Sequence, residues 1–256
     1  MATRSKPKHR QFGELISSRT GLRIDERRDD LLRRSVKAGA DLAGEDDLDR
    51  YFESLRNAPT SSPLWDDLVG QITIGETYFF RNTGHFLALE ERIFPEVLKR
   101  HQADRRIRIW SAACSTGEEP YSIAILAREI IPDLANWNLS IMGTDISKHS
   151  LQSAREGTFR DWSFRGVPQE RRDRYFQQQE GLSHLSPEIR SMVTFNYLNQ
   201  KEDEYPSLDT NTHALDLILC RNLSIYLPED VIRSIADRFY DCLIPGGWLL
   251  VGASET

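Results

Sequence analysis

The sequence predicts an α/β protein built on a doubly wound parallel sheet, and three observations support this prediction. First, a short apolar run at Ile107–Ser111 ends in small residues, turns tightly and enters an apolar helix. Second, four more apolar runs follow, separated by helical patterns, and such alternation indicates a parallel sheet. Third, polar residues follow several of these runs, at the edge where open α/β sheets bind nucleotide-like ligands.

The alternating pattern begins near residue 84. We expect strands at 107–111, 139–143, 192–197, 215–220 and 248–252, and helices at 85–100 (bent at Pro95), 120–130, 148–155 and 229–242. Residues 1–10 are predicted to be a disordered basic tail. Residues 11–75 are predicted to form an N-terminal helical domain, with amphipathic segments at 26–36, 48–55 and 64–72. Residues 76–256 would form the ligand-binding domain, with a small inserted β-subdomain at about 156–197.

Composition sets mild bounds on function. The chain has 256 residues, a net charge of −6 and no apolar run long enough to span a membrane. Its three cysteines are widely spaced, and its six histidines lack metal-ligand spacing. We therefore expect a cytoplasmic protein with reduced thiols, no metal, no nucleic-acid partner and no direct membrane insertion.

The turn at Ser115–Glu119 is the most informative motif. It has one glycine and two carboxylates, and it lacks the glycine pattern of dinucleotide sites and the Gly-Lys-Ser/Thr of phosphate loops. Glu118 and Glu119 would repel a phosphate and attract a cation. This favours S-adenosylmethionine, which carries a sulfonium and an ammonium and no phosphate, over NAD or ATP.

Asp145 ends the second predicted strand. A carboxylate at this position in doubly wound folds accepts hydrogen bonds from ribose hydroxyls. The alternative is that Asp145 or Ser147 caps the following helix. With the preceding turn, ribose binding is the better interpretation.

Two further segments combine polar and aromatic residues. In Gly75–Asn82, Arg81 could orient a carboxylate, whereas the adjacent phenylalanines more simply pack into the core. After the fourth strand, Asn222 and Tyr226 could share one face of a helical turn, or act as a cap and a half-buried aromatic residue. Cys220 is better interpreted as a buried small residue than as a nucleophile.

Taken together, these segments resemble the chemotaxis-receptor methyltransferases of the CheR family, from about Phe12 to the last residue. The most specific match is CSTGEEPYS at 114–122. Supporting matches are ETYFFR at 76–81, GTDIS at 143–147, AREGTF at 154–159, RYF at 174–176, VTF at 193–195 with Asn199, CRN at 220–222 with Ile225-Tyr226, and Gly246-Gly247 through Glu255.

The resemblance implies the cofactor S-adenosylmethionine, the product S-adenosylhomocysteine and a set of site residues. Cofactor binding would involve Thr77, Arg81, Glu118, Asp145, Asn199, Arg221 and Asn222, and the catalytic residues near the transferred methyl would be Arg81 and Tyr226. The implied acceptor is a receptor glutamate, which is already ionised at neutral pH and needs no general base. The basic helix 26–36, with Arg27, Arg28, Arg33 and Arg34, and the β-subdomain 156–197 would dock the methylation region of a chemoreceptor.

The chain also departs from the family pattern. Gly75 replaces a residue that is often polar, and the short segment between Phe176 and Val193 is typical of members that do not dock on a receptor C-terminal peptide. Trp248–Gly252 would be an uncovered apolar edge because the closing hairpin is missing, so we expect a fragment of a longer protein or a partner that covers this edge.

Three other functions remain open at this point. The first is a methyltransferase for a small carboxylic acid, against which the inserted subdomain and the basic helix argue. The second is a non-catalytic module that binds S-adenosylmethionine. The third is an NAD-dependent oxidoreductase, which the absent glycine fingerprint disfavours.

Overall fold

The structure is a computed structural model that describes residues 8–24, 29–73, 75–253 and 255. Its centre is a five-stranded sheet with the order β6-β2-β1-β7-β8, in which each neighbouring pair is parallel. The strands are β1 (Arg106–Ala112), β2 (Asn138–Asp145), β6 (Val193–Tyr197), β7 (Leu215–Cys220) and β8 (Leu243–Val251). All five lie where the sequence predicts strands.

Apolar side chains lie on both faces of this sheet. In β1, Ile107 and Ile109 belong to one buried cluster, whereas Trp110 and Ala112 belong to another. Successive side chains of a strand point to opposite faces, so a strand covered on both sides is apolar almost throughout. Every residue of β7 is buried, which is why its bounds match the predicted run.

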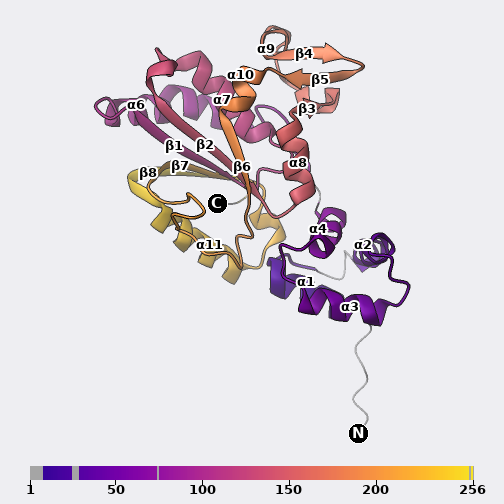
Figure 1. Cartoon of the computed structure of the whole chain (residues 1–256). Coiled ribbons are helices and arrows are strands. Elements are labelled where there is room, and N and C mark those ends of the chain that lie inside the picture. Colours follow the sequence, from indigo (N-terminus) through magenta and orange to yellow (C-terminus); the bar gives the residue numbers. More distant parts are fainter. Residues whose placement is uncertain (1–7, 25–28, 74, 254, 256) are drawn as a thin grey trace.

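Helices cover both faces. The first cluster packs against α7 (Glu118–Ile130) and α8 (Lys148–Glu156), and the second packs against α11 (Glu229–Cys242) and the N-terminal helices. Figure 1 shows the sheet between these layers, with α11 in yellow beneath it. The doubly wound α/β fold is therefore confirmed.

The segment predicted as one helix at 85–100 is divided into three parts. It forms α5 (Thr83–Ala88), one π-helical turn, η2 (Leu89–Ile93), and α6 (Phe94–Arg100). Pro95 is the second residue of α6, and it lacks the N–H that a continuous α-helix would use there. A π-helical turn lies directly before α6. The irregularity that we expected as a bend at Pro95 is therefore this wider turn.

The N-terminal helices are α1 (Lys8–Thr20), α2 (Asp29–Leu42), α3 (Leu48–Asn57) and α4 (Pro63–Ile72). The first begins within the segment predicted as a disordered tail, and it buries Phe12 and Ile16. The second extends six residues beyond Val36 to Leu42, while Arg27 and Arg28 of the predicted basic helix lie outside the described residues.

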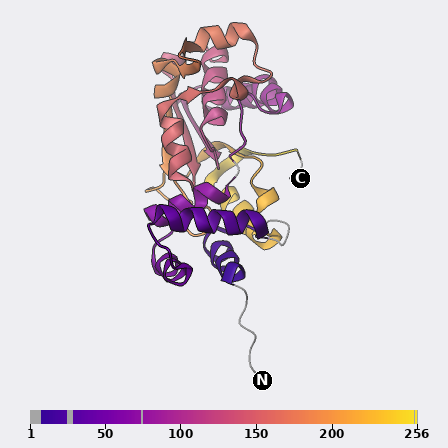
Figure 2. The ribbon, with the colours of Figure 1, turned by 90° about the vertical axis from the view of Figure 1, so that its right-hand side faces the viewer.

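The insertion between α8 and β6 forms a second, three-stranded antiparallel sheet with the order β3-β5-β4. It contains β3 (Thr158–Phe159), the 3-10 helix η4 (Asp161–Phe164), α9 (Gln169–Tyr175), β4 (Phe176–Gln179), β5 (Leu182–Leu185) and α10 (Pro187–Ser191). Figures 1 and 2 both place this sheet and the N-terminal helices at opposite ends of the molecule.

Strand β8 occupies one edge of the central sheet. It begins at Leu243, five residues before the predicted Trp248, because Leu243 already pairs with Leu215 of β7. The register then shifts, and regular pairing resumes where Trp248 meets Leu217. The sequence Pro-Gly-Gly is typical of a turn, but here the glycines accommodate a bulge.

Candidate functional site

A cavity of about 270 Å³ lies at the carboxyl edge of the central sheet. Its lining comes from the chain after α1, from the segment after α4, and from the loops that follow β1, β2, β6 and β7. Seven of the eight predicted site residues line it: Thr77, Arg81, Asp145, Asn199, Arg221, Asn222 and Tyr226. The sequence thus predicted where the loops converge, since the carboxyl ends of parallel strands meet at one edge.

The turn after β1 is strained where it meets the cavity. Ala113 and Ser115 have φ angles of 58° and 50°, and Gly117 has a φ of 93° directly before α7. Non-glycine residues adopt such angles rarely and persist there when their surroundings hold them. The Ser115 N–H donates to Asp145 Oδ2 at 2.8 Å, so the end of β2 holds this turn in place.

Asp145 lines the cavity and holds two loops. Its Oδ2 accepts from Ser115, and its Oδ1 accepts the N–H of Ser147 at 2.9 Å. Burial raises the pKa of this carboxyl, while the two backbone N–H groups oppose the rise. Ser147 caps α8, because its side chain accepts the N–H of Ser150, so the capping interpretation holds for Ser147. Ribose binding by Asp145 stays a prediction.

The two glutamates of the turn have different roles. Glu118 is 3% exposed and does not belong to the cavity lining. Its Oε2 accepts from the Thr116 hydroxyl at 2.6 Å and its Oε1 from the Ser163 hydroxyl at 2.9 Å, and burial raises its pKa. Glu119 lines the cavity instead. Sequence reasoning named Glu118 for the cofactor site. The two carboxylates are adjacent in the first turn of α7, and only the helix geometry separates them.

Glu119 is paired with Arg221, which follows β7. The Arg221 Nη1 donates to Glu119 Oε2 at 2.9 Å, and the Ser111 hydroxyl donates to Glu119 Oε1 at 2.7 Å. The Arg221 Nη2 donates to the carbonyl oxygen of Arg81. One buried guanidinium therefore joins α7, the end of β7 and the segment that carries Arg81.

The segment 75–81 forms one side of the cavity. A Cβ on Gly75 would lie 2.8 Å from Ser115 Oγ, so glycine permits this segment to approach the β1 turn closely. Thr77 and Arg81 line the cavity, and the Arg81 Nη1 donates to the Glu76 carbonyl at 2.6 Å. Phe79 is 1% exposed and stacks among core aromatic residues, which confirms the packing interpretation for that side chain.

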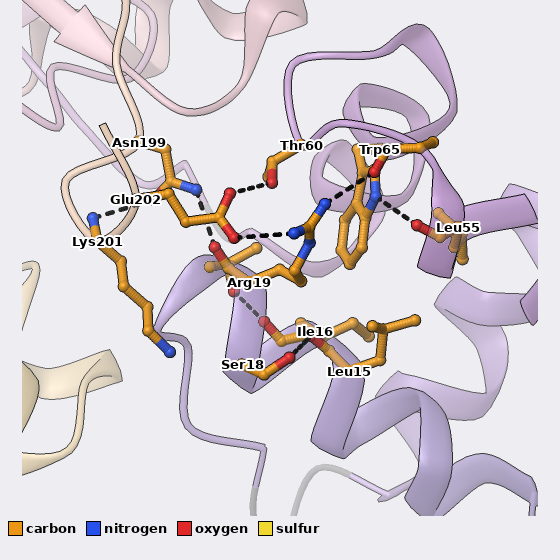
Figure 3. Close-up of polar contacts among 12 residues, drawn as sticks. Leu15, Ile16, Ser18, Arg19, Leu55, Thr60, Trp65, Asn199, Lys201 and Glu202 are labelled. Atoms are coloured by element: carbon orange, nitrogen blue, oxygen red, sulfur yellow. Dashed lines mark hydrogen bonds and ion pairs between the residues drawn. The ribbon is translucent and has the colours of Figure 1, made fainter. Parts of the chain in front are cut away.

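Asn199 connects the loop after β6 to the end of α1 (Figure 3). Its Nδ2 donates to the Arg19 carbonyl at 2.9 Å, and its Oδ1 accepts the N–H of Lys201 at 3.0 Å. Glu202 accepts from the Thr60 hydroxyl and pairs with Arg19 at 3.4 Å. Both ends of the Asn199 amide are thus engaged by protein, and its contact with a cofactor stays a prediction.

The loop after β7 carries the other two predicted residues. Asn222 has a φ of 61° and its N–H donates to Glu255 Oε2 at 2.7 Å, while the Ser224 N–H and hydroxyl donate to Glu255 Oε1. Tyr226 ends the 3-10 helix η5 (Ser224–Tyr226), and its carbonyl accepts the N–H of Arg23 at 2.7 Å. This loop is therefore fixed from the chain end and from the N-terminal domain.

Sequence reasoning missed several lining residues. Thr20 and Leu22 come from the N-terminal domain, Ser115 and Lys201 from loops, and Glu119 from the first turn of α7. Thr20 and Leu22 lie in no motif, because their place in the cavity depends on how α1 packs against the loop after β6. Ser115 and Glu119 stand inside the predicted turn and could have been included from their position alone.

Other chemistries find little support within the described ranges. There, no group of three or more His, Cys, Asp or Glu side chains is placed to hold a metal. Burial raises the pKa of Cys114 and of Cys220, which keeps both thiols protonated at neutral pH. No helix among the residues that the structure describes is long and apolar enough to cross a membrane.

Known proteins similar to this chain identify its family. Residues 75–256 match the family model "CheR methyltransferase, SAM binding domain". The chain is 39% identical over 201 residues to chemotaxis protein methyltransferase 1 of Pseudomonas aeruginosa, covering 75% of this chain and 70% of that protein. It is 30% identical over 247 residues to the chemotaxis protein methyltransferase of Borreliella burgdorferi, covering 95% and 86%.

A solved structure of the glycopeptide N-methyltransferase MtfA complexed with S-adenosyl-L-methionine matches at a TM-score of 0.35 and 14% identity, covering 62% of this chain and 52% of that one. The match to the family model covers well over half of the residues, and the curated relatives extend it into the N-terminal helices. The chain therefore belongs to the CheR family of S-adenosylmethionine-dependent methyltransferases.

Proposed function

We propose that the chain transfers a methyl group from S-adenosylmethionine to glutamate side-chain carboxylates of chemotaxis-type receptors. The observation that most supports this is the placement of Arg81 and Asp145 in one cavity of a CheR-family fold. One residue suits an incoming carboxylate and the other suits a ribose. The relatives named above are chemotaxis protein methyltransferases, which supports a chemoreceptor as the acceptor.

The residues of the cavity fit this cofactor. Asp145 accepts from the backbone N–H groups of Ser115 and Ser147, and that of Ile146 also contributes, so part of its acceptor capacity remains for a hydroxyl group. The buried Nε of Arg221 has no hydrogen-bond partner among the described residues, so this side chain keeps a donor for a polar group. Glu119 lines the same cavity, and its carboxylate is paired there with Arg221.

When bound, S-adenosylmethionine supplies an electrophilic methyl group. Thr77, Asn199, Arg221 and Asn222 would hold it together with Asp145, while Glu118 would act indirectly through the helix that carries Glu119. Arg81 would orient the acceptor carboxylate in a bidentate fork, and Tyr226 would restrict its approach. A glutamate is ionised at neutral pH, so the protein must align it and exclude water rather than remove a proton.

Receptor docking is assigned to two surfaces at opposite ends of the molecule. In α2, the exposed Arg33 and Arg34 follow Asp29 and Asp30, and Arg33 pairs with Asp29 at 3.2 Å. The second surface is the inserted β-subdomain at 156–197. The basic helix would attract an acidic methylation region, chiefly by speeding encounter.

The test is methyl transfer from labelled S-adenosylmethionine to the cytoplasmic domain of a chemoreceptor from the same organism, compared with small carboxylic acids at equal concentration. We expect label on the receptor only. Label on the small acids alone would identify a small-molecule methyltransferase, and cofactor binding without any transfer would identify a non-catalytic module. Calorimetric titration with S-adenosylmethionine and with NAD separates all of these from an oxidoreductase.

A further inference from the structure

An arginine lies between two aromatic rings at the border of the cavity. The Arg165 Cζ is 3.7 Å from the ring centroid of Tyr78 and 3.9 Å from that of Trp162. Its Nη2 donates to Glu76 Oε1 at 2.9 Å, and its Nη1 donates to the Trp162 carbonyl at 3.4 Å. A planar guanidinium stacks on both rings while its edge forms hydrogen bonds, so the three side chains form one ordered stack.

The stack connects the cavity to the inserted subdomain. Tyr78 and Glu76 line the cavity, whereas Trp162 and Arg165 belong to η4 and the residue after it. The Trp162 indole therefore lies outside the cavity, and Arg165 separates it from the lining residue Tyr78.

The turn that carries Trp162 is firmly held. The Ser163 carbonyl accepts the N–H of Phe79 at 2.9 Å, and the Ser163 hydroxyl donates to the buried Glu118. Phe164 stacks on Phe79, with ring centroids 5.1 Å apart. Trp162 thus stands on a turn whose two following residues are fixed in the core.

Trp162 is nevertheless 64% exposed. Ser163 and Phe164 hold the turn, and the indole adds its contact with Arg165 while most of its surface faces solvent. A large, rigid and exposed aromatic side chain is the type of residue that dominates protein–protein binding, since it offers much contact area for little loss of conformational entropy.

We propose that Trp162 is a docking platform for the stretch of the protein acceptor next to the methylated carboxylate, and that it contacts an apolar side chain there. This inference rests on the proposed function. A small acid inside the cavity could not reach an indole that lies beyond Arg165, whereas a polypeptide whose carboxylate enters beside Arg81 continues over the border. The platform is continuous with the cavity through Tyr78, which identifies the acceptor segment itself as the occupant.

The experiment compares Trp162→Ala, Trp162→Phe and a matched control, Tyr240→Ala. Tyr240 is 77% exposed on α11 and does not belong to the cavity lining, so it represents loss of an exposed aromatic ring elsewhere. Initial rates of methyl transfer to the receptor cytoplasmic domain give KM and kcat, and calorimetry gives the Kd for S-adenosylmethionine.

We expect Trp162→Ala to raise the KM for the receptor domain about tenfold, the scale of a binding hot spot, with kcat and cofactor Kd within about twofold of the wild type. Trp162→Phe should retain most of the affinity, and Tyr240→Ala should match the wild type. An unchanged KM for Trp162→Ala, with an active wild type, would overturn the platform and leave the proposed function intact. A parallel rise in the Kd for S-adenosylmethionine would also overturn the platform, because the substitution would then disturb the cofactor cavity rather than a contact with the receptor. A wild type that binds the cofactor but methylates no receptor would reject both.

Discussion

Arg221 and Glu119 form a buried ion pair beside the cavity, with 2.9 Å between Nη1 and Oε2. Their side chains are 3% and 13% exposed, so water screens the pair little. The same guanidinium donates to the backbone of Arg81. The position of a candidate catalytic residue therefore depends on a pair formed between α7 and the end of β7.

Removing one partner of this pair should cost more stability than removing both. Arg221→Met leaves Glu119 buried and uncompensated, and we expect a loss of about 3–5 kcal/mol in the free energy of unfolding. The double variant Arg221→Met, Glu119→Leu should recover part of that loss. Urea denaturation of the wild type, both single variants and the double variant measures this. A double variant whose loss equals the sum of the two single losses would show that the two side chains do not interact energetically.

Asp145→Ala should weaken the binding of S-adenosylmethionine by about 1–3 kcal/mol, the scale of a lost hydrogen bond to a charged group. The variant also frees the N–H groups of Ser115 and Ser147, so its stability must be measured separately by thermal melting without ligand. Calorimetry gives the affinity. A variant that melts earlier but binds normally would remove Asp145 from the ribose site.

Glu118 predicts a pH dependence of stability. Burial raises its pKa in the folded protein above the unfolded value, so the folded state holds the proton more tightly. The wild type should therefore gain stability relative to Glu118→Gln as pH falls through the folded pKa, until the unfolded pKa is reached. Glutamine keeps the size of the side chain and removes the titration. Denaturant unfolding of both proteins across this range is the measurement, and a constant difference would contradict the raised pKa.

Charge reversal on α2 tests the docking surface. Arg33→Glu should weaken receptor binding and reduce its salt dependence while cofactor affinity stays unchanged. Arg233→Glu on α11 is a matched control, because Arg233 also lies exposed and pairs with an acid four residues earlier, at 2.8 Å. If the two variants bind the receptor with equal affinity at every salt concentration, the charged face of α2 is exposed to solvent and does not contact the receptor.

Sequence patterns predicted the sheet well because its strands are buried on both faces. A short, uniformly apolar run such as Leu215–Cys220 is typical of a strand covered by helices on both sides, and the helix at 229–242 has a clear amphipathic period. The helix at 8–20 was partly missed, since a basic, polar start hides the buried Phe12 and Ile16.

Polar partners were less predictable than elements. Asn199 bonds to Arg19, which stands 180 positions earlier in the chain, and no local pattern contains that information. Glu118 and Glu119 are adjacent and chemically equal, yet one faces Ser163 and the other Arg221. The hydrogen-bond partner of a side chain depends on tertiary packing. A local sequence pattern can indicate that partner only when both residues belong to the same motif.

The chemistry of the methyl linkage tests together the roles proposed for Arg81 and for the acceptor glutamate. The receptor domain is labelled with the methyl group of S-adenosylmethionine by the wild type and by Arg81→Ala, and then treated with mild alkali. We predict that the wild-type label is a glutamate methyl ester, released by alkali as methanol. Arg81→Ala should still bind the cofactor within about tenfold of the wild-type affinity but lose transfer by a larger factor. Label that resists alkali, or equal losses of binding and transfer in Arg81→Ala, would contradict these roles.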